Sequence, residues 1–431
     1  MVRTAFRVMT LVALGLAAAA PLAARGGQPA PAAPGGGTAA PVALVHAWVL
    51  DVRDGHVTPD ATVVLRAGRI ESVSTRPAPA GVPTLDLRGK YLLPGLIDAH
   101  THLSTFDEAR RALESGVTTI RSAGVSNYAD VGLRELARQG AIPGPDVLAA
   151  GYHVRPHLAP EAFLDDPQYA WLMPGVDTIA KLRAAVQMNL SHHVDWIKVL
   201  ATERAGTPDT DPRVQTYTEP ELRAVVEEAA TQGRYVLAHA HGDEGARAAV
   251  EAGVRSIEHG TYLSDATLEL MKEKGTYFDP TYTVVIDLAE PGGDYDLPAL
   301  EIRAQHMLPR LRQTVRDAHR IGVKIVTGSD TAYGPKSLTR IPEEIVNLTT
   351  MGLSPLEAIQ AATTVNAEML QLDKEIGQVA PGFQADLIAV DGNPLNDIST
   401  VEDVLLVVSN GHVALNRLDF RKHSVTTSSG R

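Results

Sequence analysis

Short apolar runs alternate with stretches of helical periodicity over most of the chain. Eight apolar runs predict strands, near residues 95–102, 117–123, 146–151, 196–200, 235–241, 256–260, 276–280 and 324–330. The stretches between them carry apolar residues at helical spacing. Such alternation is typical of βα units around a parallel sheet, and eight units over about 270 residues match the usual size of a TIM (β/α)8 barrel. We therefore predict an α/β fold with this barrel at residues 94–375.

The two flanks of this region have a different pattern, with short two-residue alternation and turn signals. Residues 42–93 contain Asp54-Gly55 and Ala67-Gly68, and residues 376–420 contain Asn410-Gly411, a strong hairpin signal. Each flank alone is too small to bury a core. We expect one small β-sandwich domain built from both chain ends, followed by a tail at 421–431.

Two helix starts carry a capping box, in which a hydroxyl residue precedes a glutamate by three positions. Thr218 with Glu221 and Ser354 with Glu357 fit this motif. They mark the beginnings of helices between the predicted strands.

The N-terminus has the pattern of an export signal. Arg3 and Arg7 precede the apolar stretch Val8–Ala20, which is shorter than the roughly 20 residues of a membrane span. We predict a signal peptide at 1–24, although Pro21 complicates cleavage after Ala20, and a flexible linker at 25–41, rich in Ala, Pro and Gly. The protein is then periplasmic or secreted, with no membrane association once the signal is removed. An uncleaved anchor is the alternative.

The net charge and the lack of cysteine exclude some kinds of binding partner and of stabilising bond. The formal net charge is −12, and no run of lysine or arginine interrupts the acidic balance. Nucleic-acid and anionic-membrane binders need basic surface, so neither partner is expected. The chain has no cysteine, so stability in an oxidising compartment must come from packing or metal.

The first residues that could bind a metal ion lie in the stretch YLLPGLIDAHTHL, at 91–103. Asp98, His100 and His102 are spaced two apart, so in a strand they share one face. Two imidazoles beside a carboxylate can bind a divalent cation. An isolated His-x-His is more often a hydrogen-bonded pair near a turn, so the interpretation depends on the other strand ends.

Polar residues also lie within or at the ends of other predicted strands. The fourth predicted strand carries Lys198 among apolar neighbours, where an ammonium is costly unless it is paired, neutral or extended to solvent. The fifth, sixth and eighth strands end in His239-Ala-His241, Glu258-His259 and Ser329-Asp330. Together these residues predict nitrogen and oxygen donors around one mouth of the barrel.

Several long motifs resemble the amidohydrolase superfamily over Val42 to Leu415. The motifs are LPGLIDAHTH, GVTTIRSAG, DWIKVL, VLAHAHGDEGARAAVEAGVRSIEHG, VTGSD and GQVAPGFQADLIAVDGNPL. The similarity is greatest to the imidazolonepropionase-like and prolidase-like branch of metal-dependent carboxypeptidases, which includes ochratoxin A-degrading amidohydrolases.

The resemblance implies two divalent metal ions, usually Zn²⁺. His100, His102 and Asp330 would hold one ion, and His239 and His259 the other. Lys198 would be carbamylated by CO2 and bridge both ions.

The same resemblance implies roles for two neighbouring groups. In the family, the two histidines that hold the second ion are twenty residues apart, as His239 and His259 are. His239 is therefore preferred to His241 as the ligand, and His241 would support the ligands from behind or face the substrate. Asp330 would take a proton from an activated water and pass it to the leaving nitrogen.

The resemblance also implies that the substrate's terminal carboxylate is held by groups on the loops after the third and fourth strands. His153, Arg155, His157 and Tyr217 are the candidates for gripping a terminal carboxylate, and each is alternatively a solvated loop residue. His192 and His193 are expected at the surface. The chain departs from the family pattern at Arg121-Ser122, where Arg-Asp is frequent, and at Thr202–Arg204, where Ser-Gly-Gly is frequent.

These expectations describe a hydrolase that releases a C-terminal amino acid, apolar or aromatic, from a dipeptide or N-acyl amino acid. Cleavage of ochratoxin A to ochratoxin alpha and phenylalanine is an example implied by resemblance. Alternatives are a cyclic-amide hydrolase of the imidazolonepropionase type and a non-catalytic periplasmic binding protein. The resemblance also implies a homo-oligomer.

Overall fold

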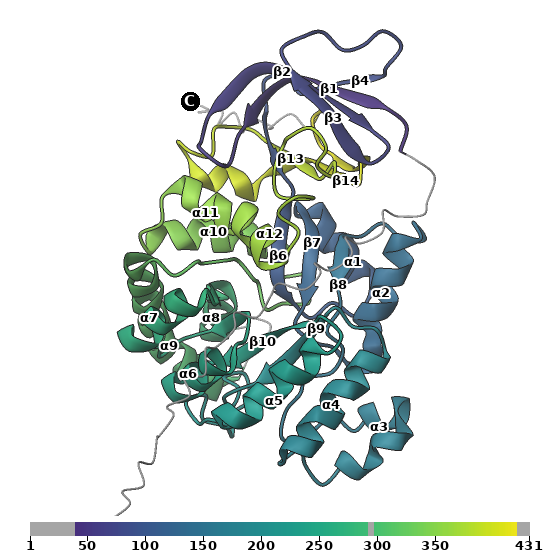
Figure 1. Ribbon diagram of the computed structural model, residues 1–431. Helices are drawn as coiled ribbons and strands as arrows, with labels where there is room; N and C mark the ends of the chain where they lie inside the picture. Colours follow the sequence, from purple (N-terminus) through teal and green to yellow (C-terminus); the bar gives the residue numbers. More distant parts are fainter. Residues whose placement is uncertain (1–38, 292–296, 420–431) are drawn as a thin grey trace, which may run out of the picture.

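The computed structural model describes residues 39–291 and 297–419 (Figure 1). The predicted signal peptide, most of the predicted linker and the C-terminal tail lie outside the described residues.

Strands from both ends of the chain form one eight-stranded sheet. Its path runs β15-β14-β13-β5-β1-β2-β3, with β4 paired to β1 (Figure 1). The strands are β1 Val42–Leu50, β2 Val57–Arg66, β3 Arg69–Ser74, β4 Thr84–Asp86, β5 Tyr91–Pro94, β13 Leu387–Val390, β14 Val404–Ser409 and β15 His412–Asn416. Apolar side chains from both ends, such as Leu44, Val63 and Leu406, share one buried cluster. The joint domain is thus built from both ends, but as one hydrogen-bonded sheet; two stacked sheets are not assigned among the described residues.

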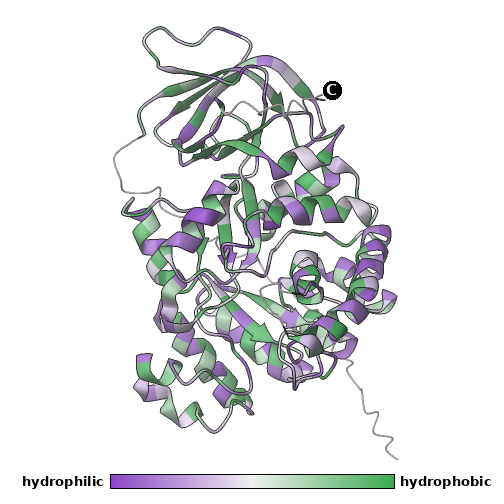
Figure 2. Cartoon of the chain, turned by 180° about the vertical axis from the view of Figure 1, so that it is seen from behind, coloured by the Kyte–Doolittle hydropathy of each residue, from purple (hydrophilic) through white to green (hydrophobic). Residues whose placement is uncertain are grey.

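The central region holds two parallel sheets. They are β6 Leu96–Thr101, β7 Val117–Ser122 and β8 Asp146–Leu148 in one sheet, and β9 Trp196–Leu200, β10 Tyr235–Ala240, β11 Ser256–His259 and β12 Tyr277–Asp279 in the other. All residues of β6, β7 and β9 are buried. Strands covered on both faces are rich in apolar residues, which is why the sequence located seven of them. Figure 2 shows how hydrophobic and hydrophilic residues are distributed over the whole chain.

The eighth predicted strand, 324–330, is wrong as a regular strand. Its backbone bonds alternately to two neighbours: the Phe278 amide donates to the Lys324 carbonyl at 2.9 Å, and the Ala99 amide to the Thr327 carbonyl at 3.0 Å. The segment therefore lies between β12 and β6, but Asp330 has φ +50°, outside the extended region. A backbone bond also joins the segment after β8 to β9, where the Val154 amide donates to the Lys198 carbonyl at 2.8 Å.

Helices surround the two parallel sheets (Figure 1). They are α1 Phe106–Glu114, α2 Ala129–Arg138, α3 Ala162–Asp165, α4 Ile179–Ser191, α5 Glu219–Ala230, α6 Asp243–Ala252, α7 Asp265–Lys274, α8 Tyr282–Ala289, α9 Pro298–Ile321, α10 Arg340–Thr350, α11 Pro355–Ala361 and α12 Thr364–Met369. Both predicted capping boxes are confirmed, at the starts of α5 and α11. The Asn410-Gly411 hairpin is confirmed as well, with φ of +51° and +78° in the turn between β14 and β15.

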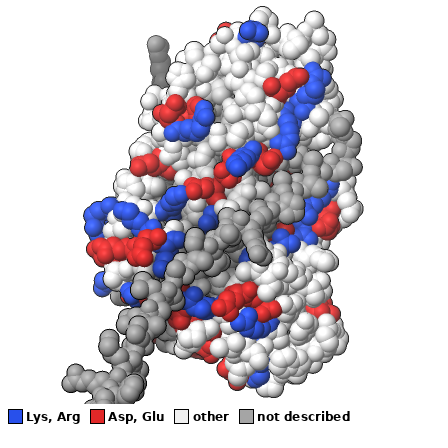
Figure 3. All heavy atoms as spheres, in the orientation of Figure 1, with Lys and Arg blue, Asp and Glu red and all other residues white. Residues whose placement is uncertain are grey.

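Charges of both signs are interspersed on the face drawn in Figure 3, many of them as neighbouring pairs. Across residues 39–291 and 297–419, none of the helices combines the length and apolar character needed to cross a membrane.

Candidate metal centre

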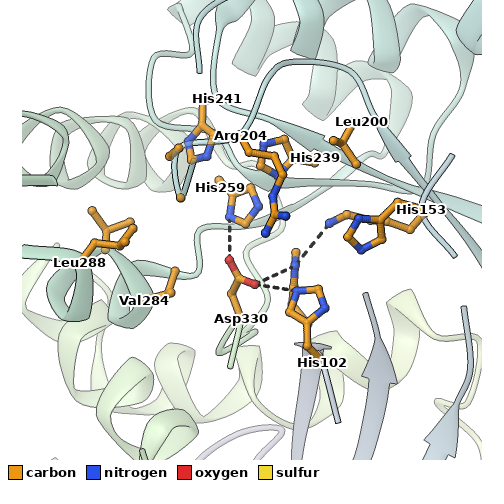
Figure 4. Close-up of a pocket in the computed structure, with 15 residues that line it drawn as sticks. His102, His153, Leu200, Arg204, His239, His241, His259, Val284, Leu288 and Asp330 are labelled. Atoms are coloured by element: carbon orange, nitrogen blue, oxygen red, sulfur yellow. Dashed lines mark hydrogen bonds and ion pairs between the residues drawn. The ribbon is translucent and has the colours of Figure 1, made fainter. Parts of the chain in front are cut away.

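The end of β6 presents two imidazoles to a buried cavity. His100 lies in β6 and His102 directly after the strand ends, and both line the cavity, where Figure 4 labels His102. The His102 Nδ1–H donates to the Gly124 carbonyl at 2.7 Å, which leaves its Nε2 2.9 Å from Asp330 Oδ1. The spacing seen in the sequence thus aims both rings at one point.

Lys198 reaches the same point from β9. Its Nζ lies 3.3 Å from His100 Nε2, and the side chain is 2% exposed. Burial lowers the pKa of Lys198 to about 8, so a neutral amine is accessible near neutral pH. The predicted alternative, a lysine extended to solvent, is wrong.

Asp330 occupies the middle of the cluster, between the imidazoles of β6 and β11. Its Oδ1 lies 3.4 Å from His100 Nε2, and its Oδ2 lies 3.9 Å from His259 Nδ1 (Figure 4). Burial by itself would raise the pKa of Asp330, but the imidazoles and Lys198 hold it well below its usual range. The carboxylate is therefore ionised and able to accept.

Asp98 fixes the backbone that carries these groups. Its Oδ1 accepts the amides of His100 and Ser329, both at 3.0 Å, and its Oδ2 accepts the Tyr333 hydroxyl at 2.8 Å. It therefore joins the end of β6 to the segment before Asp330.

Three further imidazoles stand together opposite β6. Nitrogens of His239, His241 and His259 lie within 4.8 Å of one another. Burial holds the pKa of His239 and His259 well below the usual value and that of His241 at about 3, so all three are neutral. The geometry brings both histidines of the β10 pair to the cavity and does not by itself separate a ligand from its neighbour.

Sequence reasoning missed a buried ion pair behind His100. The Arg121 Nη2 donates to both carboxylate oxygens of Glu258 at 3.0 Å, and Glu258 Oε2 lies 2.7 Å from His100 Nδ1. Burial alone would raise the pKa of Glu258, but Arg121 and His100 hold it below its usual range. The carboxylate thus accepts a hydrogen bond from the His100 Nδ1–H, which leaves the Nε2 lone pair directed into the cavity. An arginine and a glutamate inside two apolar strands were the available signal, since buried charges require partners.

Replacing Glu258 by glutamine is expected to lower the free energy of unfolding by about 3–5 kcal/mol, because the buried Arg121 guanidinium loses its ionised partner at 3.0 Å and keeps only the more distant carboxylate of Asp279, with Oδ2 at 3.9 Å. Denaturant unfolding measures this difference. Glu251→Gln, at the solvent-exposed end of α6, is the control and should change stability by less than about 0.5 kcal/mol. Equal stability of the two variants would contradict the role of the pair.

The predicted substrate contacts divide into two groups. His153 lines the cavity, and Arg155 lines an adjoining one. Tyr217 does not reach either, because its hydroxyl donates to the Val176 carbonyl at 3.0 Å within the core, and His157 is exposed outside both linings. These last two predictions are not supported by their positions.

His192 is not the free surface residue predicted. Its ring stacks on Tyr128 at 3.6 Å between centroids, and its Nε2 lies 2.8 Å from Asp166 Oδ2. His193, the neighbouring residue, is exposed as expected.

A model of the amidohydrolase family matches residues 91–414, which include every donor described above. The chain belongs to the amidohydrolase family. It is therefore a hydrolase acting on amide bonds, and its fold neighbours are of the TIM-barrel type.

Three relatives illustrate the range of the family. Ochratoxinase from Aspergillus niger is 28% identical over 410 residues, covering 84% of each chain, and its crystal structure matches with a TM-score of 0.74 at 26% identity, covering 88% of this chain and 96% of that one. A crystal structure of a Xaa-Pro dipeptidase with bound methionine matches with a TM-score of 0.77 at 28% identity, covering 87% and 99%. Imidazolonepropionase from Rhodococcus jostii is 25% identical over 389 residues, covering 79% and 83%.

Metal dependence is typical of this family, and the donors fit it. Two groups of candidate ligands, His100 with His259 and Asp330, and His239 with His241 and His259, have their atoms within 4.8 Å. Neutral imidazoles and a carboxylate are the ligands that zinc-type cations prefer. Buried and mostly uncharged, they are ready to bind without first losing protons.

Proposed function

We propose that this protein is a binuclear metal-dependent amidohydrolase that releases the C-terminal amino acid of dipeptides or N-acyl amino acids. The observation that carries the proposal is the convergence of five candidate ligands and Lys198 on one cavity (Figure 4). We infer that the two parallel sheets and segment 324–330 form the barrel that holds it.

His100, His102 and Asp330 would hold one divalent cation, and His239 and His259 a second, with zinc as the expected metal. Such a pair supplies Lewis acidity to the scissile carbonyl and to the attacking water. Asp330 lies 2.9 Å from His102, a ligand of the first ion, and 3.9 Å from His259, a ligand of the second, and these distances support the assignment.

Lys198 would join the two ions as a carbamate. Its buried amine, with a pKa lowered to about 8, can attack the carbon of CO2 and release a proton to water. The product is an anion with two oxygens. This change removes the energetic cost of a cation among neutral imidazoles and supplies negative charge where the ions lie.

Asp330 would handle the proton. Its ionised carboxylate is placed to accept the proton of the attacking water and to deliver it to the nitrogen that leaves. The amide is thereby cleaved without a covalent bond between enzyme and substrate.

The acyl side of the substrate would lie against α8. Val284, Val285 and Leu288 line the cavity. Figure 4 shows Val284 and Leu288 on the side opposite His153. An apolar wall of this kind suits an aromatic acyl group such as that of ochratoxin A, the expected substrate class that the ochratoxinase relative suggests.

A screen of N-acyl amino acids and dipeptides that differ in the C-terminal residue tests the proposal, with amine release read as kcat/KM. Apolar and aromatic residues are expected to lead. A cyclic-amide hydrolase would instead cleave small ring amides and none of this panel, and a binding protein would cleave neither after zinc and bicarbonate are supplied.

Two further features belong to the proposal. The N-terminal pattern supports a periplasmic or secreted protein, and the resemblance supports a homo-oligomer. Cell fractionation and light scattering of the purified protein test them.

A further inference from the structure

Helix α8 begins in an unusual conformation beside the metal cavity. Its N-cap residue, Thr281, is fully buried and has φ +45° and ψ +45°, in the left-handed region that a β-branched residue rarely adopts. An N-cap threonine is normally extended, and its hydroxyl accepts a backbone N–H of its own helix. Thr281 makes no such bond to an amide of the described residues. Groups outside the helix must therefore hold this conformation.

A buried carboxylate from α10 caps the helix instead. Glu344 Oε1 accepts the Tyr282 amide at 2.8 Å, and Glu344 Oε2 accepts the Thr283 amide, also at 2.8 Å. The Thr283 hydroxyl donates to the same Oε2. These bonds satisfy two amides that a helix start leaves unpaired, and negative charge is favourable there. The hydroxyl of Thr281 is thereby released from capping.

The released hydroxyl contacts a candidate metal ligand. Thr281 Oγ1 lies 2.7 Å from His259 Nδ1, and both side chains are buried. For His259 to offer Nε2 to an ion, its Nδ1 must carry the hydrogen, which then donates to Thr281 Oγ1. His241 has a different partner, because its Nδ1 lies 2.8 Å from Thr261 Oγ1. A change at Thr281 therefore acts first on the ring of His259.

The backbone is strained at both ends of this hydrogen bond. His259 has φ +76°, and Thr281 has φ +45°. Neither is a glycine, so both conformations are costly and persist because the surrounding contacts impose them. Strain of this kind gathers at functional sites, which indicates that the contact between the two side chains serves the cavity.

We propose that Thr281 is a positioning residue for the second ion: Glu344 caps α8 in its place, and the Thr281 hydroxyl holds the His259 ring in the orientation that binds metal. The proposal rests on the proposed function and deepens it, because it assigns the support of one candidate ligand. The contact also ties that ligand to α8, the helix whose apolar side chains line the cavity.

The test is retention of Zn²⁺ by the full chain, which is loaded with zinc and bicarbonate and then challenged with graded concentrations of a chelator. Wild type is expected to hold about two equivalents. Thr281→Val keeps the shape of the side chain and removes the hydroxyl. It is expected to lose one equivalent at roughly 10- to 100-fold lower chelator concentration and to hold the other as wild type does. Thr281→Ser keeps the hydroxyl and should restore most of the lost affinity.

Thr276→Val is the matched control. Thr276 is also buried, but it precedes β12 whereas Thr281 follows it, and its hydroxyl donates to the Val254 carbonyl at 3.4 Å. Zinc retention by this variant should match wild type. Glu344→Gln turns an NH2 group toward one α8 amide and is expected to weaken the same equivalent by roughly 10-fold or less. Thermal unfolding establishes that each variant is folded, and Thr281→Ala gives the same reading if Thr281→Val is not.

Zinc retention by Thr281→Val that equals wild type, an equal weakening of both equivalents, or a Thr281→Ser variant as weak as Thr281→Val would overturn the proposal. These readings do not require turnover. Thr281-dependent retention in a protein that cleaves no amide would support the positioning role and remove the proposed function. Cleavage with retention that is independent of Thr281 would do the reverse, and a wild type that holds no zinc would overturn both.

Discussion

Replacing Lys198 by alanine is expected to lower kcat for amide cleavage by at least about 10³-fold. Alanine removes the amine that would become the bridge, and with it the anion that would hold the two proposed cations together. The cavity would then hold two positive ions among neutral imidazoles, with the Asp330 carboxylate as the remaining negative ligand. Steady-state kinetics and metal analysis of the same preparation measure both consequences.

Lys181→Ala is the control, since this lysine lies on the surface of α4 and pairs with Asp177. It should behave as wild type. Acetate or formate added to Lys198→Ala is expected to restore part of the activity, because a small carboxylate fits the space left by the side chain and supplies two oxygens. Wild-type turnover by Lys198→Ala without added acid would be incompatible with the proposed centre.

Asp330→Asn is expected to reduce kcat by about 10²–10⁴-fold, the usual contribution of a general acid or base. Asparagine keeps the shape and one carbonyl oxygen but cannot take up a proton near neutral pH. It also removes the negative charge 2.9 Å from His102 Nε2. Single-turnover measurements under saturating substrate separate this loss from a change in binding.

Asp317→Asn, a partly exposed carboxylate on α9 that pairs with Arg320, is the matched control and should retain full activity. Metal content decides between the two roles of Asp330. Retention of about two equivalents with low kcat would identify a proton carrier, and loss of one would identify a ligand. A fully active Asp330→Asn would exclude both.

The sequence predicted the parallel strands well where both faces are buried. In β9 an apolar run around Lys198 located the strand, because no position faces solvent. Segment 324–330 has a similar apolar pattern but departs from strand geometry at its end. There the Ser329 backbone amide donates a hydrogen bond to Asp98, and Asp330 adopts a positive φ. Periodicity carries no information on such a local hydrogen bond.

The candidate ligands could be read from the sequence for a related reason. A parallel strand ends at the same edge as its neighbours, so polar residues at strand ends must converge. The positions of Tyr217 and His157 outside the two cavity linings could not be predicted, because loop geometry depends on contacts such as the hydrogen bond from the Tyr217 hydroxyl to the Val176 carbonyl. Neighbours from distant segments decide these positions.

The sequence by itself determined the alternating architecture, the residues that end each strand and the buried lysine among them. Only the tertiary structure decided that Arg121 and Glu258 orient His100, that Thr281 contacts His259, and that α8 forms the apolar wall. The physical reason is that strand periodicity is local, set by the alternation of side chains along one segment. The direction of a buried charge depends instead on partners that only folding brings within hydrogen-bond distance.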